Sequence, residues 1–569
     1  MKLNIQRITT LAAVSSLLWT ASCRTSDTEN TLATGGPVNI SAILDGVEFG
    51  GQTGNPQAST DRTNIGINNT KQSRTTMLDA SSFITVEAIT DNSSPKASAK
   101  INTMAAIAPV IPDTNINMLA LPIGARVRIA AYLGTSTATD RTKDYIVRAN
   151  GFLEPENGAL TLTHNQSYTL VVYSNGTPTL PVHNSSFDYT YDNDYTDLQK
   201  DFMYRKYTNY VPNGGLGTNN IVIRLQHKTT QIVTNFSFAD NLTNINSPRI
   251  EGNYLDGTIN LNNNNISTEG YVANGTKTGI VPLTIPNQNQ NSHTATATPV
   301  KINGASGTAG AITTGRFKAQ VKTTDIINNN PLSRDVDAPF LIKPGYKTTL
   351  NIVQGKCGAN INGVDRFFMC HNLGADYTKD PFTPVAEIHG GKTVWGSATV
   401  SLTQQEDQES KNGNSKSFSG SPGANSSYWN ATDGGNNNPC PSGYRVPSSD
   451  ELAQLVSSNN TLEKIGAIGT IITNFPNDSY ETGYLITSKT NKVKMFMPMT
   501  GVRNTNYTIT GSSVYATPTQ GLGIQGFYWS SDLDGTGNAK YLALTNSISF
   551  FPIMPAAVNN ASPVRCIQK

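Results

Sequence analysis

Short runs in which apolar and polar residues alternate fill most of the chain, and such alternation is typical of β-strands with one buried face. In the segment "PVNISAILDGVEFG", every second residue from Val38 to Leu44 is apolar. Comparable runs are "SSFITVEAIT", "NMLALPIGARVRIAAYLG" and "ALTLTHNQSYTLVVYSNG", and turn-forming residues separate them. The pattern therefore predicts a mainly β protein.

The strand pattern predicts three units after residue 35. One β-sandwich is predicted over residues 36–185 and a second over 186–354, where "NNIVIRLQHKTTQIVTNFSFA" and "GYKTTLNIVQG" supply strands. After the first strand comes the polar stretch "GQTGNPQASTDRTNIGINNTKQSRTT", which predicts an exposed loop that a protease can reach. The third unit, residues 355–569, contains "SSDELAQLV", which predicts a helix with Ser448 as N-cap and Glu451 completing a capping box.

Residues 1–22 predict a secretory signal peptide. Lys2 and Arg7 precede "ITTLAAVSSLLWTAS", which is too short to span a bilayer and has the length of a signal-peptide core. The segment ends in "TASC" and so resembles a lipoprotein signal, in which the Cys23 thiol is lipidated, although Thr20 stands where such signals have leucine. An ordinary signal peptide is the alternative. Residues 23–35 predict a polar tether, and we expect the outer membrane and then the cell surface as the location.

The composition excludes several classes of function. Only 14% of the residues are charged and the net charge is +2, which provides no basic surface for nucleic acid. Two acidic stretches suggest calcium, but Asp188, Asp192, Asp194 and Asp197 do not fit the EF-hand pattern, and "DLDGTGN" is interpreted as a turn. The sequence has no paired carboxylates, no nucleophile beside a base and no metal cluster. We therefore predict no catalytic activity, no metal and no cofactor.

Apart from Cys23, all four cysteines lie beyond residue 356, and an even number in an exported protein indicates disulfides. Cys440, in "NPCPSGYRVPSSDELAQLV", is the cysteine that suggests a catalytic thiol. A reactive thiolate needs a nearby histidine or a helix N-terminus, but His389 is about 50 residues away in the sequence. The adjacent Cys370 and His371 would point to opposite faces of a strand, which argues against a dyad. Cys440 is therefore interpreted as structural.

Three segments between residues 36 and 350 share their strand pattern and spacing with one bacterial family: "IPDTNINMLALPIGARVRIAAYLG", "YIVRANGFLEPENGALTLTHNQSYTLVVYSNG" and "LQKDFMYRKY…IVIRLQHKTTQIV". They resemble the fimbrillin-like subunits of type V pili. The resemblance implies export as a lipoprotein, removal of the first strand by an arginine-specific protease, and insertion of a strand from another subunit into the open groove. On this resemblance "VNISAILDG" is the removable strand, and Arg62 or Arg74 is the cleavage site. The alternative is an uncut lipoprotein that keeps this strand.

The third unit carries six motifs in order: "KCGANINGVDRFFMCHNLGADYTKDPFTPVAEIHGGKTVWG", "NPCPSGYRVPSSDELAQLV", "MFMPMTGVRN", "GFYWSSDLDG", "NAKYLALT" and "SPVRCIQK". It resembles the fibrobacter-type major paralogous domain, which implies an α+β fold related to C-type lectins with long recognition loops. We expect the disulfides Cys440–Cys566 and Cys357–Cys370 here, and Trp529 in the core. The candidate ligand contacts, all in loops between the motif strands, are Asn504, Asn506, Tyr507, Tyr515 and Phe551.

Together these features predict an adhesive component of a pilus, with two pilin-like sandwiches and a lectin-like head. Because Cys566 would tie "VRCIQK" into the head, this segment could not act as a donor strand, which suggests a position at the tip. The expected partners are other pilus subunits, through strand addition, and an unknown glycan or protein ligand. The alternative is a lipid-anchored surface protein that binds such a ligand outside pili.

Overall fold

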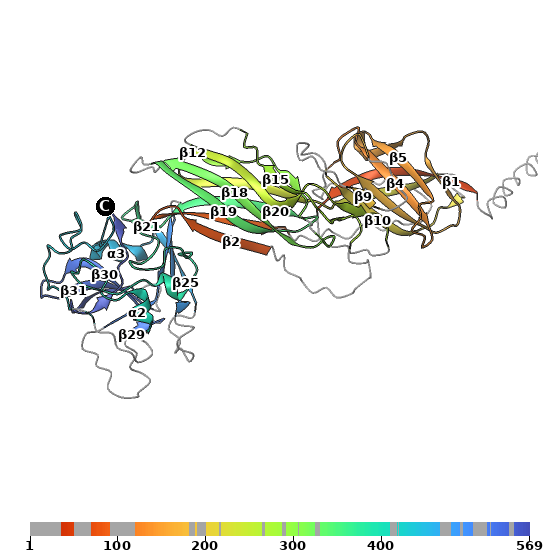
Figure 1. Ribbon diagram of the computed structural model, residues 1–569. Helices are drawn as coiled ribbons and strands as arrows, with labels where there is room; N and C mark the ends of the chain where they lie inside the picture. Colours follow the sequence, from red (N-terminus) through yellow and green to blue (C-terminus); the bar gives the residue numbers. More distant parts are fainter. Residues whose placement is uncertain are drawn as a thin grey trace, which may run out of the picture.

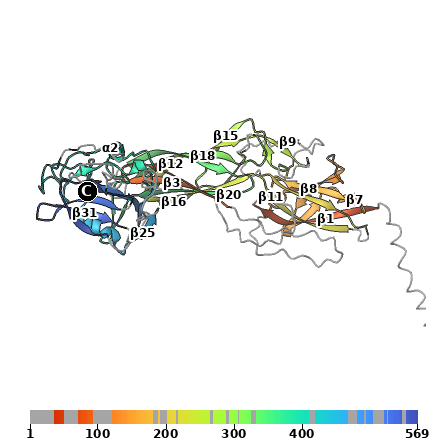
Figure 2. The same cartoon turned by 90° about the horizontal axis from the view of Figure 1, so that it is seen from below.

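The chain folds into three bodies in a row: a β-barrel at one end, a second sheet in the middle and a head at the other end (Figures 1 and 2). The computed structural model describes residues 36–49, 70–91, 120–180, 188–190, 201–214, 218–263, 268–286, 292–304, 307–324, 331–409, 418, 420–466, 480–489, 493–503, 520–523, 525–545 and 551–569. The predicted mainly β fold is confirmed. Among the residues given above, we find no helix with the length and apolar character needed to cross a membrane.

The barrel is one sheet that closes on itself. Its strand order is β11-β10-β8-β4-β5-β6-β1, and β1 also pairs with β11, so that the two ends of the sheet meet. β7 adds to the same edge of β1 as β6. The strands are β1 (Pro37–Glu48), β4 (Arg126–Leu133), β5 (Arg141–Val147), β6 (Phe152–Pro155), β7 (Leu160–Thr163), β8 (Tyr168–Ser174), β10 (Met203–Tyr210) and β11 (Thr218–His227).

β1 is the strand that closes the barrel. It runs parallel to β11 over nine paired positions, from Asn39 to Glu48, with a register shift between Leu44 and Gly46. Its other edge runs antiparallel to β7 and β6. The alternating residues Val38, Ile40, Ala42 and Leu44 are buried, as their spacing predicts. Taking β1 away would therefore leave an open slot between β11 on one side and β6 and β7 on the other, which we call the β1 groove.

The middle sheet has the order β19-β18-β12-β20-β3-β2, and β15, β16 and β17 add to the long strand β12. Its apolar core is separate from that of the barrel. The strands are β2 (Thr70–Met77), β3 (Ser82–Thr90), β12 (Thr230–Tyr254), β15 (Thr278–Pro282), β16 (Ser292–Thr296), β17 (Val300–Ile302), β18 (Thr313–Thr324), β19 (Pro331–Ile342) and β20 (Lys347–Lys356).

The division of strands between the two sheets differs from the predicted units 36–185 and 186–354. β2 and β3 belong to the middle sheet, where β3 pairs with β20, whereas β10 and β11 belong to the barrel. In the first unit, the pairing of β1 with β11 joins the two ends of one sheet. The reason is that alternation shows that a strand has a buried face, but it carries no information about which distant strand will be its neighbour.

A small third sheet joins the barrel to the middle sheet. It has the order β14-β13-β9, with β9 at Asp188–Thr190, β13 at Thr258–Asn260 and β14 at Val272–Ala273. Ile259 and Val272 of this sheet pack in one cluster with Tyr204 on the outside of the barrel. The Tyr204 hydroxyl donates to the Leu261 carbonyl at 2.6 Å. The segment that connects β12 to β15 therefore packs against the outer surface of the barrel.

The described residues of the head form short strands, two short α-helices and 3-10 turns. The predicted capping box of α3 is present, with Ser448 and Glu451 each bonded to the other's backbone. Trp395, Trp429 and Trp529 are all fully buried. The elements are β21 (Gly358–Ile361), β22 (Val364–Phe367), η3 (Ala386–Ile388), β23 (Thr393–Val394), α2 (Gln404–Glu409), β24 (Tyr444–Arg445), α3 (Ser449–Ala453), η5 (Gln454–Val456), β25 (Asn460–Ile465), β26 (Gly483–Ser488), β27 (Lys494–Pro498), β28 (Thr500–Val502), β29 (Gln520–Leu522), β30 (Gly526–Leu533), β31 (Ala539–Leu544), β32 (Ile553–Ala556), β33 (Ala561–Ser562) and β34 (Ile567–Gln568).

Candidate functional site

The β1 groove includes a polar contact inside the barrel. The hydroxyl of Tyr145 donates to the Ile40 carbonyl at 3.0 Å and accepts from the Leu160 backbone N–H at 3.2 Å. Burial raises the pKa of Tyr145, so the hydroxyl remains protonated and can donate at neutral pH. Without a strand in the groove, this buried donor would lose its acceptor, which is unfavourable.

The C-terminal end of β1 is held by charges. Asp45 accepts from Arg224 of β11, with 3.1 Å between Oδ2 and Nε and a second, shorter contact to the guanidinium. Glu48 accepts from Arg205 at 3.4 Å and from the Gln226 side chain at 3.2 Å. The alternating pattern of β1 does not by itself predict these charged contacts. The available signal was a pair of acids at the end of an otherwise uncharged strand, together with an arginine inside the apolar run "IVIRL".

The two predicted cleavage residues have different surroundings. Arg62 lies outside the described residues. Arg74 does not lie in a loop as predicted, since it is an exposed residue of β2 and pairs with Val86 of β3. The polar sequence of β2 was mistaken for a loop because an edge strand with a solvent-facing side needs few apolar residues.

β2 and the residue that follows it are also bonded to β19. The Arg334 side chain donates to the Leu78 carbonyl at 2.7 Å, and the Gln72 side chain accepts from the backbone N–H of Leu341 at 3.1 Å. Both partners belong to β19. A protease would have to pull β2 out of the middle sheet to cut at Arg74.

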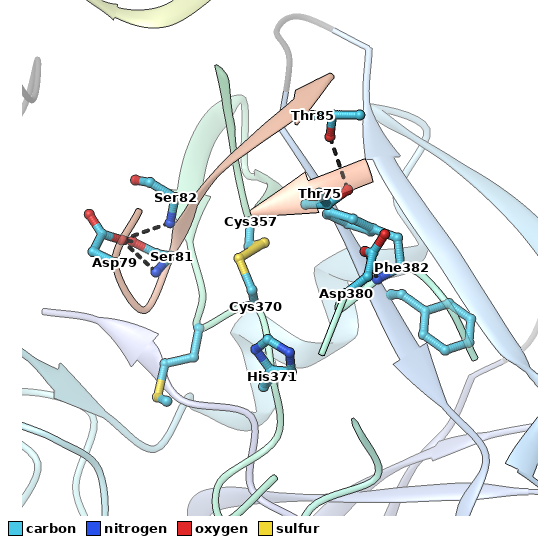
Figure 3. Close-up of a disulfide and its surroundings, with 12 residues drawn as sticks. Thr75, Asp79, Ser81, Ser82, Thr85, Cys357, Cys370, His371, Asp380 and Phe382 are labelled. Carbon is cyan, nitrogen blue, oxygen red and sulfur yellow. Dashed lines mark hydrogen bonds between the residues drawn. A yellow bond between two sulfur atoms is a disulfide. The ribbon is translucent and has the colours of Figure 1, made fainter. Parts of the chain in front are cut away.

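The turn between β2 and β3 is inserted into the head beside the disulfide Cys357–Cys370 (Figure 3). The backbone N–H of Cys357 donates to the Ser81 carbonyl, and that of Cys370 donates to the Ala80 carbonyl, both at 2.7 Å. Inside the turn, the Asp79 carboxylate accepts from the backbone N–H groups of Ser81 and Ser82 (Figure 3). An N-terminal hairpin thus fixes the head to the middle sheet.

Both expected cysteine pairs are bonded: Cys357 with Cys370 and Cys440 with Cys566. Next to Cys566, the fully buried Arg565 donates to the carbonyls of Met369, Cys370 and Phe496. Burial lowers the pKa of Arg565 to about 10, so it remains a cation at neutral pH. β34 pairs with β24. Residues 565–568 are therefore held in the head by the Cys440–Cys566 disulfide, by this strand pairing and by the hydrogen bonds of the Arg565 guanidinium.

Of the predicted ligand contacts in the head, Phe551 lies among the described residues. Asn504, Asn506, Tyr507 and Tyr515 lie outside the described residues. Phe551 does not lie on the surface, because it is 5% exposed and its ring packs edge-on against Tyr484. An aromatic residue in a loop can fold back over the core, and this outcome cannot be separated from exposure by sequence alone.

The acids of "DLDGTGN" and His371 have structural partners. Of the acidic residues at 188–197, only Asp188 is described, within β9. In "DLDGTGN", Asp532 accepts from Ser449 at the start of α3, and Asp534 accepts from Thr536 and Asn538 within its own turn. The side chain of His371 contacts the Lys379 carbonyl rather than Cys370.

A buried charge cluster lies where β11 passes into β12. Asp201, 1% exposed, accepts from Nδ1 of His227 and from the Thr229 hydroxyl, and Lys301 approaches it to 2.6 Å. Burial raises the pKa of Asp201, but His227 and Lys301 outweigh this and lower it to about 2. Because Lys301 belongs to the middle sheet and His227 to the barrel, this cluster locks the two bodies together. His227 and Asp201 are 26 residues apart, and no sequence pattern links them.

Comparisons with known proteins do not give the chain a family. No family model matches it and no curated protein matches it. A candidate cell adhesion protein from Bacteroides fragilis aligns at 12% identity over 58% of this chain and 95% of its own, with a TM-score of 0.27. The fimbrial anchor protein Mfa2 from Porphyromonas gingivalis aligns at 12% identity over 40% and 93%, with a TM-score of 0.23. The tip fimbrial protein Mfa3 from the same organism aligns at 11% over 38% and 76%, with a TM-score of 0.24. Likeness at this level does not establish a shared function.

Proposed function

We propose that the protein is an exported adhesive subunit of a surface polymer, in which a strand from a neighbouring subunit replaces β1. The observation that carries this proposal is that β1 alone closes the barrel, between β11 and the β6–β7 edge. An empty groove exposes apolar side chains and unpaired backbone groups, which another extended chain can satisfy. Removal of one strand therefore turns a closed barrel into an acceptor.

The head is proposed to bind a surface ligand, a glycan or a protein, without catalysis. It lies at the far end of the molecule from the barrel (Figure 1). Its segment 565–568 is held by Cys566 and the β24 ladder, so this segment is not free to enter a neighbour's groove. Both features favour a position at the end of a polymer. The lipid on Cys23, the signal peptide and the cleavage after β1 remain part of the proposal.

A second candidate is an uncut, lipid-anchored binding protein outside pili. It is favoured by the complete set of contacts that β1 already makes in the barrel, including its paired acids Asp45 and Glu48. Cleavage distinguishes the two candidates, because only the first requires β1 to leave.

We expect Arg62→Ala to keep β1 in the surface protein and to exclude the protein from sheared pili. Arg74→Ala is the matched control and should be processed like the wild type, because Arg74 lies in β2, which pairs with β3 and is also bonded to β19 through Gln72 and the adjoining Leu78. N-terminal sequencing of surface and sheared fractions gives the result. A chain that carries both Arg62→Ala and Arg74→Ala completes the test. If this chain still appeared in sheared pili without its β1 strand, cleavage at these arginines would be ruled out.

We also expect that cutting the chain between β1 and β2 does not by itself release β1. The strand keeps nine paired positions with β11, four with β7 and two with β6, and its inner side chains stay buried. Native size-exclusion chromatography followed by mass spectrometry of the denatured peak should find the β1 peptide with the nicked chain. Spontaneous loss of the peptide under native conditions would show that the ladder is too weak to require a competing strand.

A further inference from the structure

We propose that the β1 groove selects an acidic strand, one that places a carboxylate against Arg224 and a second carboxylate three residues later against Arg205 and Gln226. This inference rests on the strand replacement proposed above and defines the chemistry of the incoming partner. Alternating apolar residues fit the groove but are common to most half-buried strands, so they give little discrimination. The charged end of the groove supplies the discrimination that the apolar part lacks.

The charged end is well buried with β1 in place. The side chains of Asp45 and Arg224 are 12% and 11% exposed, and those of Glu48 and Arg205 are 8% and 13% exposed. A strand with neutral residues at these two positions would cover the Arg224 guanidinium without giving it a counter-charge. Covering a charge in this way is strongly unfavourable. A strand with basic residues there would add repulsion.

The backbone between Asp45 and Glu48 further restricts the sequence that an incoming strand can have. The register against β11 shifts between Leu44 and Gly46, so that Asp45 bulges out of the ladder toward Arg224. Gly46, at the bulge, has φ 149°, a conformation that other residues rarely adopt. The expected partner therefore carries an alternating apolar run followed by the pattern acid, glycine, apolar residue, acid. β1 itself, ending in "LDGVE", meets this requirement.

A competition refolding experiment tests the selection. The full chain, nicked between β1 and β2, is unfolded and refolded with equal amounts of two synthetic peptides. Their masses differ from each other and from that of the resident β1, so that mass spectrometry can distinguish all three strands. One has the sequence of residues 37–49, and the other carries Asp45→Asn and Glu48→Gln. Mass spectrometry of the refolded complex gives their ratio. We expect the acidic peptide to be favoured by roughly 30-fold or more. A Ser41→Ala peptide, altered away from the charged end, is the matched control and should compete equally with the acidic peptide.

The outcomes separate the inference from the proposed function. Equal incorporation of the acidic and neutral peptides overturns the acidic selection but leaves strand replacement intact. If the refolded chain contains only its resident β1 and has incorporated neither synthetic peptide, both strand replacement and the acidic selection are overturned. In an Arg224→Gln chain the preference for the acidic peptide should fall several-fold, because one partner of the Asp45 contact is gone. If that chain does not refold, the peptide ratio in the unsubstituted chain still decides.

Discussion

Replacing Cys440 and Cys566 together with alanine should lower the free energy of unfolding of the head by about 5 kcal/mol, because the disulfide closes a loop of 126 residues. The matched variant, with Cys357 and Cys370 replaced by alanine, removes a bond that spans only 13 residues and should cost about 3 kcal/mol. Fluorescence gives a direct readout, since Trp395, Trp429 and Trp529 share an apolar cluster with Cys440 and Cys566.

Denaturant unfolding of the two double variants, compared with the unsubstituted protein, checks this order. The loss of stability should arise in the unfolded state, because the unfolded chain gains more conformational entropy when the longer loop is opened. A larger loss for the Cys357–Cys370 pair would contradict the loop-length explanation. It would indicate instead that this bond acts mainly through the β2–β3 turn that Cys357 and Cys370 hold by their backbone N–H groups.

Asp201→Asn should lower the free energy of unfolding of the barrel and middle sheet by about 3 kcal/mol near neutral pH, because a buried carboxylate is removed from the Lys301 ammonium and from its contact with Nδ1 of His227. Calorimetry of the full chain measures the change. The control is Asp337→Asn, which breaks the exposed ion pair with Arg316 and should have little effect.

The effect of Asp201 has a defined pH dependence. Its neighbours lower its pKa in the folded protein to about 2, below the unfolded value of about 3.9. The stabilisation is therefore complete above pH ~4 and is lost as the pH falls toward 2, because the unfolded chain binds the proton first. The difference between the unsubstituted protein and Asp201→Asn should shrink over this window. A difference that stays constant down to pH 2 would show that the carboxylate charge is not responsible.

Local features of the fold could be predicted from the sequence. The strand at Val38–Leu44 and the capping box at Ser448 depend on residues within a few positions of one another. The assignment of strands to sheets could not be predicted in this way. β1 and β20 both alternate between buried and more exposed residues, yet β1 pairs in the barrel and β20 in the middle sheet. Only contacts between distant segments decide this, and a single sequence does not record them.

The candidate site divides in the same way. The strand β1 was predicted from its apolar alternation and its removal is proposed from a resemblance, but the charges at its end were not predicted. Arg224 and Asp45 are 179 residues apart, so neither the acids of β1 nor the arginine in "IVIRL" indicates by itself which partner it meets. Arg74 was assigned to a loop because exposed edge strands and loops share a polar composition. Phe551 was assigned to the surface although it lies over Tyr484.

The pairing of β3 with β20 has a consequence for biogenesis. Thr90 and Thr348, which lie opposite each other in this ladder, are 258 residues apart. A chain that is exported from its N-terminus delivers β3 long before β20 is available, and β1 likewise waits for β11. Such high contact order slows folding and exposes strand edges during delivery. If the chain is exported as proposed above, it should therefore depend on a periplasmic holding chaperone. A product that stops before residue 347 should be degraded because its β2–β3 hairpin has no sheet to join.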